Sequence, residues 1–118
     1  MDEKNLPWRR KTQRFVVRVD SEILIFEEKI PCIIKDLSER GAKLEFRKSL
    51  NCPPLLKVKL KVPYKEKREG EVKFKFVTAQ ICWKDKEGKS VGIKFLERDP
   101  FLYRQLDFYL QDFRNQPN

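Results

Sequence analysis

Three residues interrupt two β-rich segments of the chain at a spacing that could hold a ligand. The motif Asp36-x-Ser38-x-x-Gly41, within KDLSERG, places a carboxylate, a hydroxyl and a glycine in one short connection. A carboxylate accepts hydrogen bonds from N–H donors, a hydroxyl donates and accepts, and a glycine lets the backbone approach another group closely. The same residue types also build ordinary turns, in which glycine supplies a positive φ. The motif is compatible with a small-molecule site and with a structural turn.

A pair of arginines lies at the start of the first β-rich segment of the chain. Arg10 and Arg14 are four residues apart, and Arg9 adds a third guanidinium. The planar guanidinium fork bonds to phosphates and to guanine edges in a way that lysine does not imitate. The spacing alone carries little information, because Arg14 and Arg18 fit it as well. Its position just before the first strand is more informative, since neighbouring strands can bring both motifs onto one surface.

The segments that position these residues read as β-strands. Runs of Val, Ile, Leu and Phe predict strands at residues 14–26, 30–37, 42–46, 55–62, 71–83 and 90–97. The stretch LLKVKLKV is the clearest, because its apolar residues alternate with lysines and predict a sheet with one face toward water. In the next strand the alternation through Val72, Phe74 and Phe76 changes phase near Val77. That change predicts a bulge, and we expect both phenylalanines to be buried.

After the last predicted strand, the spacing of the apolar residues changes from that of a strand to that of a helix. Asp99 suits a helix N-cap and Pro100 the first helical position, and an apolar stripe follows at Leu102, Leu106, Tyr109, Leu110 and Phe113. The expected fold is all-β with a C-terminal helix, a six-stranded antiparallel β-barrel, because closure removes free sheet edges. We expect one domain in three parts, with a flexible N-terminal arm at 1–13, the barrel at 14–98 and an amphipathic helix at 99–114.

The composition excludes several classes of chemistry. The chain has no histidine, and Cys32, Cys52 and Cys82 form no CxxC pair, so neither a metal site nor a disulfide is expected. We expect the cysteines to pack in the interior. No nucleophile–base pair or phosphate loop is present, so we expect no enzyme and no cofactor.

The overall charge bears on the class of ligand, and the apolar content and the N-terminus bear on the location of the protein in the cell. A formal charge of +9 favours an anionic ligand or a polyanionic partner, although many basic domains bind neither. No apolar run is long enough to span a membrane, and the N-terminus lacks a secretory signal. Since the sequence begins with Met1, we expect a complete, cytoplasmic protein.

Together these stretches resemble the PilZ domain, the bacterial receptor module for cyclic di-GMP. The resemblance is carried by RRKTQRF at 9–15, DLSERG at 36–41 and VGIKF at 91–95, which precedes the helix. It extends from Arg9 to about Phe113. It implies a split barrel of the PilZ type and a receptor or adaptor that acts in second-messenger signalling, such as the control of motility or biofilm formation.

The resemblance also implies how the ligand is held. Arg10 and Arg14 would bind its phosphates or the O6 and N7 atoms of guanine, and Arg9 would add charge. Asp36 would accept hydrogen bonds from the N1–H and N2–H₂ donors of guanine. Binding would draw the N-terminal arm onto the barrel and change the affinity for a protein partner.

Four further residues have implied or alternative roles. Ser38 would orient a base or phosphate, and Gly41 would let the backbone approach the ligand. Trp83, near the end of the fifth strand, would stack on a guanine as aromatics do in some family members, or it would be half-buried at the barrel rim. Lys94 would face the same site or simply be solvated.

Two alternatives to the ligand-switched adaptor remain. The lysines at 57, 59, 61, 73 and 75 would form the nucleic-acid-binding face of a small barrel, or a solvated face that discourages edge aggregation. Burial of Phe74 and Phe76 would count against nucleic acid, because stacking on bases needs exposed aromatic rings. The second alternative is a PilZ-like interaction module without ligand. The identity of the protein partner, and the choice between a monomer and a weak homodimer, stay open.

Overall fold

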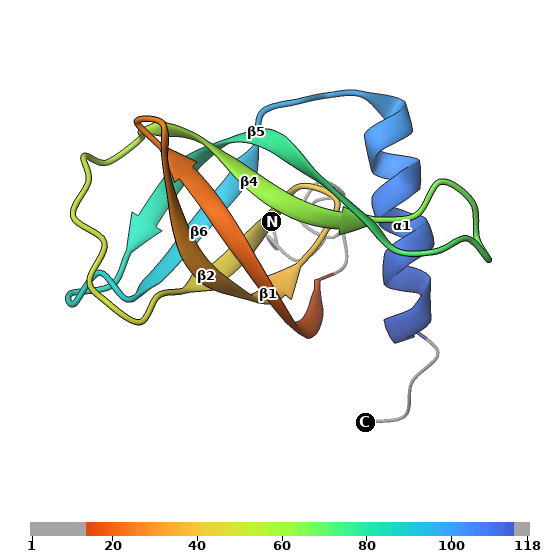
Figure 1. Ribbon diagram of the computed structural model, residues 1–118, viewed down its shortest axis with the longest axis horizontal. Coiled ribbons are helices and arrows are strands. Elements are labelled where there is room, and N and C mark those ends of the chain that lie inside the picture. The colour runs from red at the N-terminus through yellow and green to blue at the C-terminus, as the bar shows by residue number, and fades with distance from the viewer. Residues whose placement is uncertain (1–13, 115–118) are drawn as a thin grey trace, which may run out of the picture.

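The alternating segments of the sequence form six antiparallel strands that close into a barrel, with one helix at its end (Figure 1). This computed structural model describes residues 14–114. The strands are β1 (Phe15–Ile25), β2 (Glu28–Leu37), β3 (Gly41–Glu45), β4 (Lys57–Tyr64), β5 (Lys73–Lys84) and β6 (Ser90–Phe95), and the helix is α1 (Pro100–Arg114). The fold class expected from the sequence is confirmed. The segment expected to be an arm, with Arg9 and Arg10, lies outside the described residues.

The order of strands around the barrel is β1-β2-β3-β6-β5-β4. Four of the neighbouring pairs are consecutive in sequence and need only short connections, whereas β3 with β6 and β1 with β4 join distant segments. The β1–β4 contact is short, with Ile23 opposite Leu60 and Leu24 opposite Lys59. These two distant pairings close the sheet on itself, so every strand has a neighbour on both sides.

The barrel interior is filled by one side of each strand. In β4, Val58, Leu60 and Val62 are buried and the intervening lysines point outward, which confirms the alternation expected for this segment. In β5 the corresponding inward residues are Val77, Ala79 and Ile81, all with at most 1% of their surface exposed. The core therefore lies inside the ring of strands and continues to the buried residues of the C-terminal helix.

Two expectations for β5 were wrong. Its register against β4 is regular from Lys73 to Gln80, and the irregularity lies later, between Ile81 and Trp83. Phe74 is 45% exposed and Phe76 half-buried, because both lie on the outward side of the strand, whereas Val77, Ala79 and Ile81 point inward. Since Phe76 and Val77 are both apolar, the sequence did not indicate which of them belongs to the inner face.

The helix is fixed to the barrel by its cap, its apolar stripe and two polar contacts. The Asp99 carboxylate accepts a hydrogen bond from the Phe101 N–H at 2.9 Å, which confirms the expected cap. Leu102, Leu106 and Leu110 are fully buried where α1 packs on β4 and β1. The contacts Lys65 Nζ to Asp112 Oδ2 at 2.5 Å and Lys75 Nζ to Gln105 Oε1 at 2.6 Å attach the helix to the ends of β4 and β5. Within the described residues, no helix has the length and apolar character needed to cross a bilayer.

We expect Leu106→Ala to lower the free energy of unfolding by about 2–5 kcal/mol, because it leaves a cavity between helix and barrel. Phe101→Ala is the matched control, since Phe101 lies on the same helix and is 71% exposed. It should change the free energy of unfolding by less than about 0.5 kcal/mol. Urea denaturation followed by circular dichroism measures both. Equal losses would contradict the packing of α1 on the barrel.

Candidate functional site

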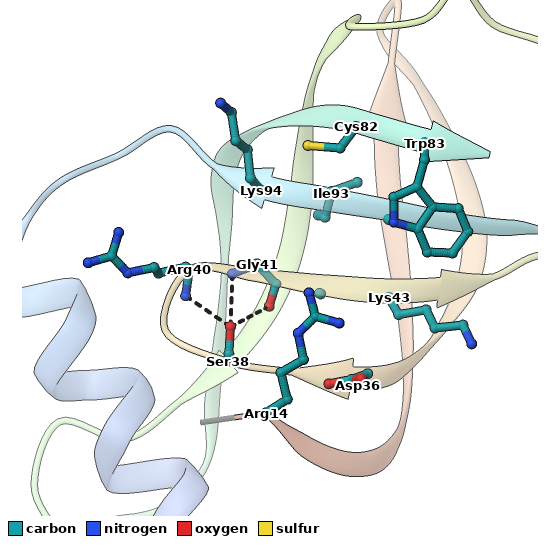
Figure 2. A pocket seen from close by; sticks show the side chains of 12 residues that line it. Arg14, Asp36, Ser38, Arg40, Gly41, Lys43, Cys82, Trp83, Ile93 and Lys94 are labelled. Carbon is teal, nitrogen blue, oxygen red and sulfur yellow. Dashed lines mark hydrogen bonds between the residues drawn. The ribbon is translucent and has the colours of Figure 1, made fainter. Parts of the chain in front are cut away.

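The connection between β2 and β3 is a turn held by the hydroxyl of Ser38. The Ser38 Oγ accepts hydrogen bonds from the N–H groups of Arg40 at 3.1 Å and Gly41 at 3.2 Å, and the Ser38 N–H donates to the Gly41 carbonyl at 2.9 Å. The side chain is buried, with 5% of its surface exposed. Ser38 is therefore a positioning residue in this structure, because its hydroxyl is engaged with the backbone of its own turn (Figure 2).

Gly41 is required by close packing rather than by its backbone angle. A Cβ atom at this position would lie 2.2 Å from the Ile93 carbonyl oxygen and 3.1 Å from the Lys94 Cα. Its φ is not positive, unlike that of Gly88, so the turn reading that gave Gly41 a positive φ was wrong. The glycine instead allows the first residue of β3 to pair tightly with β6, where it lies opposite Lys94.

Asp36 is turned toward solvent by an irregularity in β2. Ile34 and Leu37 are both fully buried, although strict alternation would put residues 34 and 36 on the same face. The register between β2 and β3 shifts between Ile34 and Asp36. This shift lets Leu37 enter the core and leaves Asp36 on the outer side, opposite the exposed Lys43.

Trp83 is placed by a second irregularity of the same kind. Ile81 is buried, so strict alternation would also direct Trp83 inward, yet Trp83 is 47% exposed. The register between β5 and β6 shifts between these two residues, which leaves Cys82 as the extra residue of a bulge. The indole rests on Gly92, where a Cβ atom would lie 2.1 Å from the Trp83 Nε1 atom. Gly92 therefore provides the space that the ring occupies.

These residues surround one open hollow on the outer surface of the barrel, with a volume of about 300 Å³. Its lining residues are Arg14, Asp36, Ser38, Arg40, Gly41, Ala42, Lys43, Cys82, Trp83, Gly92, Ile93 and Lys94. Figure 2 shows the Arg14 guanidinium extending over the start of β3 in the direction of the Trp83 indole, whereas Arg40 and Lys94 extend away from them. The structure thus brings together Arg14, both motif side chains, Gly41 and Trp83. The remaining sequence-predicted residues, Arg9 and Arg10, fall in the part of the chain that is not described.

The hollow has an excess of positive charge. Four cationic side chains, Arg14, Arg40, Lys43 and Lys94, line it beside the single carboxylate of Asp36. Since all four cations are exposed, they remain available to an incoming anion. An open, cationic hollow with a carboxylate and an indole at its margin suits a ligand that combines phosphates with flat, hydrogen-bonding rings.

Half of the lining residues were missed by sequence reasoning: Arg40, Ala42, Lys43, Cys82, Gly92 and Ile93. Arg40 could have been predicted, since it is a cationic residue inside the motif, directly before Gly41. Lys43 and Gly92 could not, because their placement depends on the pairing of β3 with β6, in which they lie opposite one another.

The three cysteines have different environments. Cys32 and Cys52 are buried, as expected, and burial, together with the nearby Glu22 carboxylate, raises the pKa of Cys32 to about 12. Cys82 is exposed at the hollow, so its expected interior packing was wrong. Residues 14–114 contain no group of three or more side chains that could hold a metal ion.

The chain is similar in sequence to one family and in fold to solved structures. The sequence profile of the PilZ domain matches residues 9–112. The structure of the Bacillus subtilis inhibitor of motility, MotI (DgrA), is similar with a TM-score of 0.72 and 17% identity, covering 93% of this chain and 54% of MotI. The chain therefore spans about half the length of MotI. No curated protein matches the sequence.

A second solved structure is the PilZ domain of YcgR from Escherichia coli, described with c-di-GMP. It is similar with a TM-score of 0.67 and 14% identity, covering 90% of this chain and 92% of the YcgR chain. At these identities the two structures show a shared fold. Because the PilZ profile covers most of the sequence and the barrel has the fold of these structures, the protein belongs to the PilZ domain family.

Proposed function

We propose that this protein is a receptor for cyclic di-GMP that binds the dinucleotide between its N-terminal arginines and the Asp36–Gly41 turn. The observation that carries the proposal is the meeting of Arg14, Asp36 and Trp83 around one cationic hollow. The family supports it, since the similar YcgR domain is described with this ligand. The protein acts as a binding module and not as an enzyme.

The chemistry of the ligand matches the residues of the hollow. Cyclic di-GMP has two phosphates in a ring and two guanines, so it needs cations, acceptors for the guanine N–H groups and flat apolar surface. The Arg14 fork bonds to a phosphate or to the O6 and N7 atoms of guanine. The Asp36 carboxylate accepts from the N1–H and N2–H₂ groups, and the Trp83 indole stacks on a base. Ser38 acts indirectly, by holding the turn.

The proposed output is a change in affinity for a protein partner. Arg9 and Arg10 add their guanidinium groups to the phosphates, so that the bound ligand joins the segment before β1 to the surface of β2, β3 and β6. Fixing each residue of such a segment costs about 1–2 kcal/mol of backbone entropy, which the charge-assisted contacts must exceed. The surface formed by ligand and segment together is what the partner recognises.

Arg14→Ala and Asp36→Ala should abolish stabilisation by cyclic di-GMP. At a hundredfold excess over its Kd, the ligand should stabilise the unaltered protein by about 2.7 kcal/mol and raise the Tm by several degrees. Differential scanning fluorimetry with and without ligand measures the shift. Arg18→Ala is the matched control, because Arg18 shares the arginine spacing and is exposed on β1 but does not line the hollow. An unchanged Tm in the unaltered protein would refute the proposal.

Gly92→Ala should weaken ligand binding by displacing the Trp83 ring. If stacking contributes about 1–3 kcal/mol, the loss of affinity is roughly 5- to 150-fold, and Trp83→Ala should lose a similar amount. The double variant should lose no more than either single one, because both changes remove the same contact. Isothermal titration calorimetry gives the affinities. Gly70→Ala, in the β4–β5 loop, is the control, and additive losses would show that Gly92 acts by another route.

Cys82 should report directly on occupancy of the hollow. At pH 8 a thiol reagent should modify the exposed Cys82 quickly and the buried Cys32 slowly, because the raised pKa of Cys32 keeps its thiol protonated. Saturating cyclic di-GMP should slow the fast reaction several-fold. Cys82→Ser removes that phase and identifies it. A ligand that stabilises the protein without protecting Cys82 would have to bind elsewhere.

A further inference from the structure

The outward sides of β4 and β5 carry a row of lysines beside a row that includes two aromatic rings. We call this surface the lysine–phenylalanine face; it consists of Lys57, Lys59, Lys61, Phe74 and Phe76. Across the β4–β5 pair, Lys61 lies opposite Phe76 and Lys59 opposite Thr78. Alternate residues on one side of a strand are about 6.7 Å apart. The lysines are therefore spaced comparably to successive phosphates of an extended nucleic-acid strand.

The aromatic rings of this face are accessible and lie beside cations. Phe74 is 45% exposed, and the Lys61 Nζ atom lies 5.5 Å from the centre of its ring. Phe76 is half-buried, and Lys29 Nζ lies 6.0 Å from its ring centre. The sequence predicted that both rings are buried, and this expectation counted against nucleic-acid binding. The structure removes that objection.

The charge of the face is largely uncompensated. Lys61 approaches the Glu22 carboxylate at 4.0 Å, with both side chains more than a third exposed, so this pair is weak. Lys57 and Lys59 are exposed and form no ion pair with any residue between 14 and 114. Like-charged lysines at this spacing repel one another, and a polyanion relieves that repulsion.

Protection of a sheet edge does not explain these lysines. Lysines on an edge strand prevent pairing with other chains. β4, however, is paired with β5 from Lys57 to Tyr64 and with β1 at Leu60 and Lys59, inside a closed barrel. Lys59 is paired on both sides, and the Lys61 carbonyl accepts a hydrogen bond from the Ser21 hydroxyl of β1, so protection of a free edge does not explain these two lysines.

We propose that the lysine–phenylalanine face binds single-stranded nucleic acid, with the lysines on the phosphates and the bases stacked on Phe74 and Phe76. Stacking on aromatic rings beside a cationic track is how small barrels bind single strands without sequence preference. A protein partner fits less well, because lysine is depleted from the centres of protein–protein interfaces.

This face is separate from the cyclic di-GMP hollow. The hollow lies over β3, β6, the end of β2 and the C-terminal end of β5, whereas the face occupies β4 and the N-terminal half of β5. None of the five residues of the face lines the hollow. The two ligands should therefore bind at the same time.

The proposal is tested by fluorescence anisotropy with a labelled oligothymidylate of about 20 nucleotides, long enough for one barrel. The affinity should fall steeply as salt rises from roughly 50 to 200 mM. Lys57→Gln with Lys59→Gln should weaken binding about tenfold or more and reduce the slope of log affinity against log salt by about 1.4, since each phosphate contact contributes about 0.7. Lys48→Gln with Lys86→Gln, in exposed loops, removes the same charge and should change affinity less than about twofold.

Phe74→Ala should weaken binding about fivefold or more, and Phe74→Trp should restore it, because a larger ring stacks at least as well. Circular dichroism checks that each variant is folded. Four results would overturn the proposal: no binding by the unaltered protein at low salt, equal losses in the two double-lysine variants, displacement of the oligonucleotide by cyclic di-GMP, or equal competition by polyglutamate. The last would indicate a surface that recognises charge alone.

Discussion

The candidate site depends on the pairing of β3 with β6. This pair joins segments that are about fifty residues apart in the sequence, and it sets Gly41 opposite Lys94 and Lys43 opposite Gly92. Both glycines make room at this junction: Gly41 for the β6 backbone and Gly92 for the Trp83 indole. A side chain at Gly41 would push β3 away from β6, and one at Gly92 would displace the indole. The two glycines thus let the turn after β2 and the end of β5 face one another across β6. The hollow exists because these two regions are held against one another.

Two register irregularities then direct two side chains of the hollow outward. By alternation, Asp36 belongs to the same face as Ile34, and Trp83 to the same face as Ile81, and both of those partners are buried. A shift in β2 and a shift in β5 turn the polar and the aromatic side chain to the outer surface. Bulges are common beside binding sites for this reason, because they re-aim single side chains without changing the strand order. The barrel keeps its core while both side chains line the hollow.

This arrangement explains how much the sequence could predict. The strands, the helix with its Asp99 cap and the buried residues of β4 follow from local alternation and capping, so they were predicted correctly. The motif residues were singled out because their types and spacing are distinctive, and the structure places them together at one hollow. Lys43 and Gly92 were missed because only the long-range β3–β6 pairing brings them to the hollow. The turn between β1 and β2 was expected at residues 27–29 and lies at Phe26 and Glu27, where both residues have positive φ, at 50° and 68°, without a glycine to indicate the exact position.

The orientation of β5 was the hardest feature to predict, and it decides which aromatic rings lie on the outer surface. Phe76 and Val77 are adjacent apolar residues at the point where the inner face begins, so periodicity alone does not separate core residues from surface ones. Once Val77, Ala79 and Ile81 occupy the interior, Phe74 and Phe76 must lie outside beside the lysines of β4. The same strand then reaches the hollow through Trp83, beyond its bulge. β5 therefore contributes Trp83 to the hollow and both Phe74 and Phe76 to the lysine–phenylalanine face.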